Sequence, residues 1–158
     1  MIGSMTSALS PADLVAWRTF LRAHATVVRR LEAELVAEHD LPLASYDVLV
    51  QLSEAPDRRL RMTELADRVL LSRSGLTRLA DRLEREGLIE RKACPSDARG
   101  TLAVLTPAGL ARLRVAWPTH LRGVAEHVTG RLSAAELVRL RELLTKLLDE
   151  PESPETLA

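Results

Sequence analysis

A short segment of the chain, residues 72–86, gathers side chains that form hydrogen bonds with anionic or polar partners. These donors and hydroxyls are Ser72, Arg73, Ser74, Thr77, Arg78 and Arg82. Arginine binds a phosphate or a guanine edge through two parallel hydrogen bonds, and small hydroxyls act at close range. The chemistry that this combination favours is contact with a nucleic acid. The alternative is a solvated helix face with ordinary surface ion pairs.

Further cationic side chains follow within the next fifteen residues. Arg91 and Lys92 belong to a strand-like stretch at 88–93, and Arg99 belongs to the loop after it. This loop, residues 94–100, is rich in turn-forming residues, and a second strand-like stretch follows at 101–105. Two strands joined in this way form a hairpin, whose cations can follow a DNA backbone or enter a minor groove.

Three predicted helices position these groups. Ser72 caps a helix that runs to Glu86, and Gly87 follows where a left-handed residue usually ends a helix. A short helix at 62–69 precedes it, and another at about 43–54 comes before that. A helix-turn-helix followed by a hairpin is a winged-helix arrangement, and its second helix fits the major groove.

Longer helices flank this unit. Ser10 and Pro11 start a helix that ends near His39, and Thr106 starts another that runs to about Thr129 with a kink expected at Pro118. A capping box at Ser133 opens the last helix. Apolar residues recur in steps of three and four on the first helix, at Leu14, Trp17, Leu21, Val28, Leu31 and Leu35, with His24 among them, and on the last at Leu137, Leu140, Leu144 and Leu147. Such seams need a partner surface.

The net charge of the chain conceals an uneven distribution. The 158 residues contain 22 Lys+Arg and 22 Asp+Glu, so the formal charge is zero. Residues 1–57 hold 4 Arg against 8 acidic residues, whereas residues 58–100 hold 11 Lys+Arg against 7 acidic residues. The last 58 residues hold 7 of each. The basic excess therefore coincides with the predicted winged helix, and the neutral total does not exclude a nucleic-acid partner.

Other function classes find little support. No Gly-rich phosphate loop, nucleophile–base motif or carboxylate cluster indicates an enzyme, and four scattered histidines do not indicate a metal site, so we expect no cofactor and no bound metal. The chain has one cysteine, no apolar run long enough for a membrane span and no signal-peptide core. We therefore expect a cytoplasmic protein without a membrane partner.

Four motifs in order resemble those of the MarR family of bacterial transcriptional regulators, over roughly residues 12–149. The motifs are residues 72–79 (SRSGLTRL), 83–91 (LEREGLIER), 97–100 (DARG) and 105–109 (LTPAG). The first two resemble the recognition helix and the strand after it. The third matches the Asp-any-Arg motif of the wing, and the fourth matches the start of the next helix.

The resemblance implies a homodimer that binds a pseudo-palindromic operator in double-stranded DNA, most often as a repressor, with a small ligand tuning its binding. It implies that Asp97 holds Arg99 while Arg99 enters the minor groove. It also implies a dimer interface formed by helices at both chain ends, with Leu14, Trp17, Leu21, Val28, Leu137, Leu140, Leu144 and Leu147. The effector pocket of the family would place Trp17, His24, Tyr46 and Trp117 as candidate lining residues, although core or interface packing is the favoured explanation of these residues.

The expected fold is mostly α-helical with a small β-hairpin wing: a winged helix-turn-helix with N- and C-terminal dimerisation helices. We expect an irregular N-terminus at 1–9, a dimerisation helix at 10–40, the DNA-binding domain at 41–105, dimerisation helices at 106–149 and a tail at 150–158. Two alternatives stay open: a winged helix that binds proteins, and a redox-responsive regulator that acts through Cys94.

Overall fold

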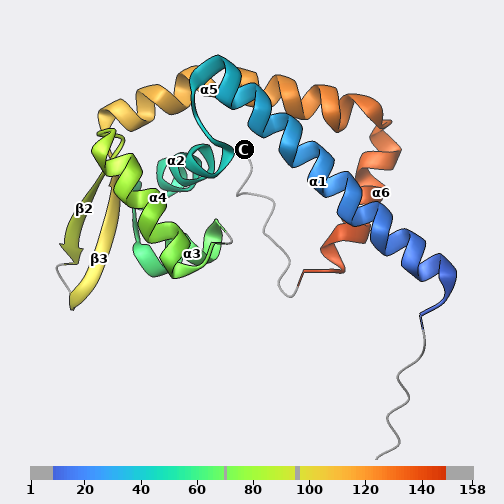
Figure 1. Cartoon of the computed structure of the whole chain (residues 1–158), viewed down its shortest axis with the longest axis horizontal. Coiled ribbons are helices and arrows are strands. Elements are labelled where there is room, and N and C mark those ends of the chain that lie inside the picture. The colour runs from blue at the N-terminus through green and yellow to red at the C-terminus, as the bar shows by residue number, and fades with distance from the viewer. Residues whose placement is uncertain (1–8, 70, 95–96, 149–158) are drawn as a thin grey trace, which may run out of the picture.

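The computed structural model describes residues 9–69, 71–94 and 97–148, so most of the expected irregular ends at 1–9 and 150–158 lies outside the described residues. Its six α-helices, two 3-10 turns and three strands confirm the predicted mostly helical winged helix-turn-helix (Figure 1). In chain order they are α1 (Pro11–His39), α2 (Leu43–Glu54), η1 (Pro56–Arg58), β1 (Arg59–Arg61), α3 (Met62–Arg68), α4 (Arg73–Arg85), β2 (Ile89–Cys94), β3 (Asp97–Leu105), α5 (Pro107–His127), η2 (Thr129–Arg131) and α6 (Ala134–Thr145).

Local signals set the helix ends as the sequence predicts. The hydroxyls of Ser10, Ser72 and Ser133 each accept a hydrogen bond from a backbone N–H in the first turn of α1, α4 and α6. Each cap satisfies an amide that the helix leaves without a partner. Gly87 follows α4 with a φ of 71°, a conformation that glycine adopts without strain. α5 begins at Pro107 and continues as one helix through Pro118.

The sheet is larger than the predicted hairpin. It has three strands in the order β1-β3-β2, and both pairings are antiparallel. β1 is three residues long and pairs with β3 from Arg59↔Val104 to Arg61↔Leu102. β3 begins at Asp97, inside the segment that the sequence predicts as a loop, because its backbone pairs with Cys94 across a register shift. Long-range pairing thus overrides the turn-forming residues there.

The winged-helix region, residues 41–105, has its own apolar core. Its fully buried side chains come from every helix of the region and from both long strands, and include Leu49, Leu52, Leu65, Leu76, Leu83 and Ile89. α5 closes this core through Leu113 and Ala116. Gly109 permits the contact, because a Cβ there would overlap the carbonyl oxygen of Leu88. The core therefore fixes α4 relative to the strands and to α5.

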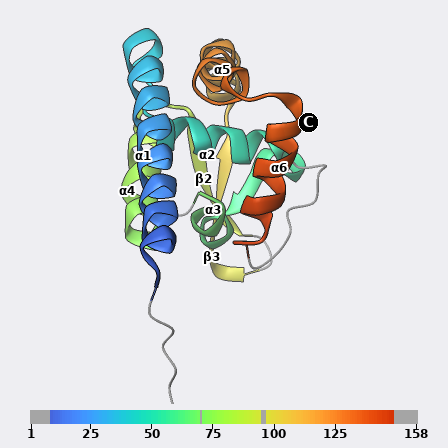
Figure 2. The ribbon, with the colours of Figure 1, turned by 90° about the vertical axis from the view of Figure 1, so that its right-hand side faces the viewer.

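The three long helices, α1, α5 and α6, leave apolar surface uncovered. Every large apolar side chain that is exposed in the described residues lies on these helices or next to one of their ends. α6 buries none of its residues and stands apart from α1, as Figure 2 shows. α1 packs against α5 through Leu31 and Leu35 only toward its C-terminal end. None of the described helices has the length and apolar character that would let it cross a bilayer.

The residues predicted for a dimer interface fall on this surface. Trp17 is 55% exposed and stacks on Phe20 at 6.1 Å between ring centroids, and Leu147 is 68% exposed. The other members are exposed (Leu21, Val28, Leu144) or half-buried (Leu14, Leu137, Leu140). Leu31 and Leu35 of the same seam are buried within the chain. The α1 seam therefore divides into an internal half and an uncovered half.

Candidate nucleic-acid interface

α4 has one buried face and one exposed face. Leu76, Ala80 and Leu83 recur every three to four residues and are buried in the core. Arg73, Ser74, Thr77 and Arg78 project from the opposite side and are exposed. This helix is thus held by its apolar stripe while its polar stripe faces outward, next to the strands β2 and β3 (Figure 1).

Three guanidiniums of α4 form no ion pair with a described residue, and one of these, Arg85, donates instead to the backbone carbonyl of Asp81. Neither Arg73 nor Arg78 forms an ion pair with any described residue, whereas Arg82 Nε lies 2.8 Å from Glu86 Oε1. Glu86 raises the pKa of Arg82 through this hydrogen bond. Exposed guanidiniums without partners are free to bind phosphates or base edges. Arg73 and Arg78 therefore fit the predicted role more directly than Arg82 does.

The hydroxyls of α4 divide into structural and available groups. Ser72 Oγ accepts from the Gly75 amide at 3.1 Å, so this side chain caps the helix. Thr77 Oγ1 donates to the Arg73 carbonyl at 2.9 Å and keeps its lone pairs for a donor. Ser74 Oγ lies 3.3 Å from Ser72 Oγ, with either atom able to donate.

Arg91 of β2 has a setting that the sequence does not predict. Its guanidinium lies between two acids of α4, with Nη1 2.7 Å from Asp81 Oδ1 and Nη2 2.6 Å from Glu84 Oε2. Its Nε and its backbone N–H also donate to Glu84, at 2.8 and 3.0 Å. The Arg91 side chain is 30% exposed, so water screens these contacts only in part. The pairing joins β2 to α4.

The Arg91 hydrogen bonds hold the pKa of Glu84 below its usual value, because they favour the carboxylate over the neutral acid. The same contacts raise the pKa of Arg91. Both groups are thus charged at neutral pH, so the contact is an ion pair there. Glu84 and Asp81 therefore act as partners of Arg91, and not only as solvated surface acids.

The remaining wing residues lie on the two long strands. Lys92 Nζ is 3.0 Å from Glu90 Oε2, and both side chains are exposed, so this pair contributes little to stability. Asp97 and Arg99 belong to β3, but their side chains lie outside the described part of the chain. Cys94 is buried at the end of β2.

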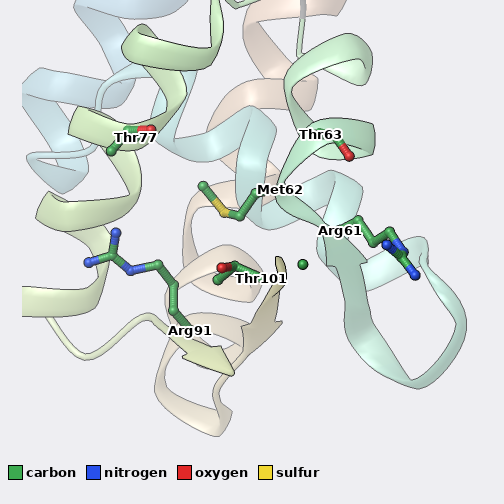
Figure 3. Close-up of a pocket in the computed structure, with 7 residues that line it drawn as sticks. Arg61, Met62, Thr63, Thr77, Arg91 and Thr101 are labelled. Carbon is green, nitrogen blue, oxygen red and sulfur yellow. The ribbon is translucent and has the colours of Figure 1, made fainter. Parts of the chain in front are cut away.

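A hollow of about 410 Å³ opens between α3, α4 and β3 (Figure 3). Thr63 and Thr77 lie on two sides of it with Met62 between them, and Arg61 and Arg91 lie at opposite ends. Thr101 and Gly100 complete the lining. Sequence reasoning missed the residues that β1 and the start of α3 contribute. The available signal was the Arg-Leu-Arg alternation at 59–61, which is too short to predict a strand by itself.

The residues predicted for an effector pocket do not share one environment in a single chain. Tyr46 is buried and packs on His120 with 4.5 Å between ring centroids. Trp17, His24 and Trp117 are exposed. Burial raises the pKa of Tyr46 and lowers that of His120, because it disfavours the charged form of each. Tyr46 Oη, Ser45 Oγ and His120 Nδ1 are buried without a hydrogen-bond partner among the described residues.

Comparisons with known proteins agree with this geometry. A profile of the MarR family matches residues 39–100. The chain is 30% identical to the HTH-type transcriptional regulator MhqR of Bacillus subtilis over 112 residues, which cover 71% of this chain and 75% of that protein. It is similar to the crystal structure of Sco3205, a MarR family transcriptional regulator from Streptomyces coelicolor in complex with DNA. The TM-score is 0.85 at 35% identity, covering 93% of this chain and 96% of the other.

A second solved structure, of a mutant MarR from E. coli complexed with operator DNA, matches with a TM-score of 0.74 at 28% identity. The match covers 85% of this chain and 94% of that one. The described helices and strands therefore have counterparts over nearly the whole of both regulators.

Proposed function

The chain belongs to the MarR family of transcriptional regulators, and from that premise we propose that it binds a pseudo-palindromic operator in double-stranded DNA as a homodimer and represses transcription. The observation that carries this proposal is the exposed face of α4, where Arg73 and Arg78 have no ion pair among the described residues. A helix of 13 residues with such a face has the size and chemistry to enter a major groove.

In this proposal α4 reads the bases. Arg78 and Arg73 bind guanine edges or phosphates, and Ser74 and Thr77 supply hydroxyls at close range. Ser72 acts through the helix cap, and Arg82 acts through its pair with Glu86. Sco3205 and the E. coli MarR variant were both solved with DNA, which supports the same assignment here.

The wing supplies the second set of DNA contacts. We assign minor-groove or phosphate contact to Arg99 and phosphate contact to Lys92, with Asp97 orienting Arg99. Arg91 differs, because its guanidinium already binds Asp81 and Glu84. Its proposed role is to hold the wing in position relative to α4.

Burial supports the proposed assignment of roles along the chain. Residues 10–40 and 106–149 form the dimer, and residues 41–105 bind DNA. The uncovered apolar surface of the three long helices supports this division, since a second copy would remove it from water. Two winged helices would then contact successive turns of a site of roughly 15–20 base pairs.

A small phenolic ligand is the proposed regulator of this binding. The buried and unpartnered polar atoms of Ser45, Tyr46 and His120 support a polar ligand or water where α2 meets α5. Trp17, His24 and Trp117 are exposed in a single chain, so they would line a ligand site only where a second copy covers them.

The two alternatives have less support. A protein-binding winged helix would not need unpaired guanidiniums along α4, and a polar face of this kind is typical of nucleic-acid contact. A redox role for Cys94 requires an accessible thiolate, whereas this side chain is buried.

The test uses an operator selected from fragments of the source genome, with binding measured by fluorescence anisotropy at several salt concentrations. Arg78→Ala should weaken binding by about 1–3 kcal/mol and relax the sequence preference. Arg99→Ala should weaken binding to all sequences and lower the salt slope by about one.

Arg139→Ala is the matched control, because it removes the same charge from α6, far from α4 (Figure 1). Operator binding by this variant should equal that of the wild type. Wild-type affinity in both Arg78→Ala and Arg99→Ala would show that the DNA-binding face has been misassigned.

A further inference from the structure

The crossing of α1 and α5 brings together a histidine and two carboxylates. Glu34 belongs to α1, and Glu126 and His127 end α5. His127 Nε2 lies 2.5 Å from Glu34 Oε1, and ligand atoms of all three residues lie within 4.8 Å of one another. Nothing in the sequence indicates this, because 92 residues separate Glu34 from Glu126.

Burial at this crossing points to a missing electropositive partner. The His127 side chain is only 7% exposed, and its Nδ1 is buried without a hydrogen bond to any described residue. Glu34 Oε2 is also buried, and it has no donor among the described residues. A buried carboxylate oxygen without a donor is unfavourable, so a cation at this position would compensate for its lost hydration.

The backbone makes room for the Glu34 carboxylate. Gly123 faces α1, and a Cβ at this position would overlap Glu34 Oε2 and crowd Leu31. A glycine here lets the two helices approach closely around the carboxylate. The crossing is thus built around a half-buried acid, 29% exposed, whose Oε2 is buried, although an apolar residue would pack there more simply.

From this geometry we propose that Glu34, Glu126 and His127 bind one divalent transition-metal ion, with Zn²⁺ as the representative ion. One imidazole nitrogen and two carboxylates form a mixed N/O set that suits borderline ions, and three protein ligands leave a position for water. Ligand atoms around a tetrahedral ion lie about 3–3.5 Å apart, so His127 and Glu34 would separate slightly on binding.

Solvent access and nearby charge set the expected affinity for the metal ion. A hollow of about 380 Å³ on the outside of this crossing is lined by His127 and gives the ion a route from solvent. Three arginines, Arg22, Arg30 and Arg131, line the same hollow, and their positive charge opposes a further cation. We therefore expect micromolar affinity, and a bound ion that braces α1 against α5.

The test measures Zn²⁺ binding to the tag-free, chelator-stripped full chain by competition with a chromophoric chelator. The expected result is one ion per chain. His127→Ala and Glu34→Gln should each weaken binding at least about tenfold, the loss that removing even a ligand's outer-shell partner commonly produces. His24→Ala is the matched control, because His24 is an exposed histidine of α1, and it should bind Zn²⁺ like the wild type.

Glu126→Gln keeps the test decisive if the two buried substitutions disturb folding. Glu126 is exposed, so this variant should fold like the wild type by circular dichroism while it binds Zn²⁺ more weakly. Absence of binding at submillimolar Zn²⁺, or equal binding by the wild type and Glu126→Gln, would overturn the proposal. Operator binding is measured separately, so failure of this site leaves the DNA-binding assignment intact.

Discussion

The winged-helix region and the three long helices bury apolar side chains to very different degrees. In the described part of residues 41–105, every large apolar side chain is buried or half-buried. α1, α5 and α6 instead expose several valines, leucines and both tryptophans, and α6 has no buried residue. The first region buries its apolar side chains, with Leu35 of α1 and Leu113 and Ala116 of α5 completing its core, whereas the long helices leave apolar surface that needs another apolar surface to cover it.

Charge is concentrated in one part of the winged-helix region. Residues 58–100, which contain α3, α4, β2 and the first part of β3, carry four more basic than acidic residues. Residues 41–105 as a whole carry 11 basic against 10 acidic residues, so the basic excess belongs to this segment and not to the whole region. The proposed partners of the two regions follow from this segment and from burial: a polyanion for α4 and the wing, and a second copy for the long helices.

The largest expected effect comes from disrupting the exposed apolar surface of the long helices. Leu144→Glu puts a charge on an exposed apolar position of α6 and should dissociate the dimer. Operator affinity should then fall by about 100-fold or more, because each half-site would bind independently. Light scattering after gel filtration measures the mass, and anisotropy measures binding to the selected operator.

The control for this experiment changes a charge at a position outside the exposed apolar surface. Glu54→Arg alters an exposed side chain at the end of α2 in the winged-helix region, and its mass in solution should equal that of the wild type. A monomeric wild type at micromolar concentration, or an unchanged mass for Leu144→Glu, would remove the proposed role of the long helices.

A smaller effect tests how the winged-helix region keeps its two DNA-contacting parts aligned. Arg91→Ala and Glu84→Gln remove opposite charges from the same contact between β2 and α4. If this contact positions the wing, both variants should weaken operator binding by about tenfold, which is 1.4 kcal/mol, with unchanged salt slopes. Anisotropy across salt concentrations gives both quantities.

The sign of the Glu84→Gln effect distinguishes the two roles of Arg91. If Arg91 bound DNA directly, removing a neighbouring negative charge would strengthen binding, and Arg91→Ala would lower the salt slope by about one. Glu90→Gln is the matched control, because Glu90 is an exposed acid of β2 whose only ion pair among the described residues is with Lys92. We expect it to leave operator affinity unchanged or slightly higher.

Local chemistry explains which parts of the fold were predictable from the sequence. Ser10, Ser72 and Ser133 each cap a helix by accepting a hydrogen bond from the backbone N–H three residues further along. Gly87 adopts a positive φ that would strain other residues. The family motifs also identified α4 as the exposed polar helix. β1 escaped prediction because three residues form a strand only through their pairing with β3, more than forty residues away.

The contacts that set the site are similarly long-range. Arg91 is an ordinary wing cation in the sequence, and its partners depend on how β2 lies beside α4. His120 meets Tyr46 only because α5 crosses α2, so no sequence pattern links these two residues. Residue type indicated which side chains could do chemistry, and packing decided which of them were already engaged.

The smallest expected effect concerns the junction between the two regions, where His120 of α5 packs on Tyr46 of α2. Burial lowers the pKa of His120 from its ordinary value of 6.5, so the folded protein resists a proton that the unfolded chain accepts. The contribution of His120 to the free energy of unfolding should therefore be constant above about pH 6.5. Below that pH it should fall by at most about 1.4 kcal/mol per pH unit.

Urea unfolding between about pH 5 and 8, at one protein concentration, measures this slope. His120→Gln cannot take up a proton, so its stability should fall less steeply with acid than that of the wild type. His24 is an exposed histidine of α1, so His24→Gln should leave the pH slope of the stability unchanged. If the free energy of unfolding had the same pH slope in the wild type and in His120→Gln, water would reach the junction. The two regions would then be coupled less tightly than their packing indicates.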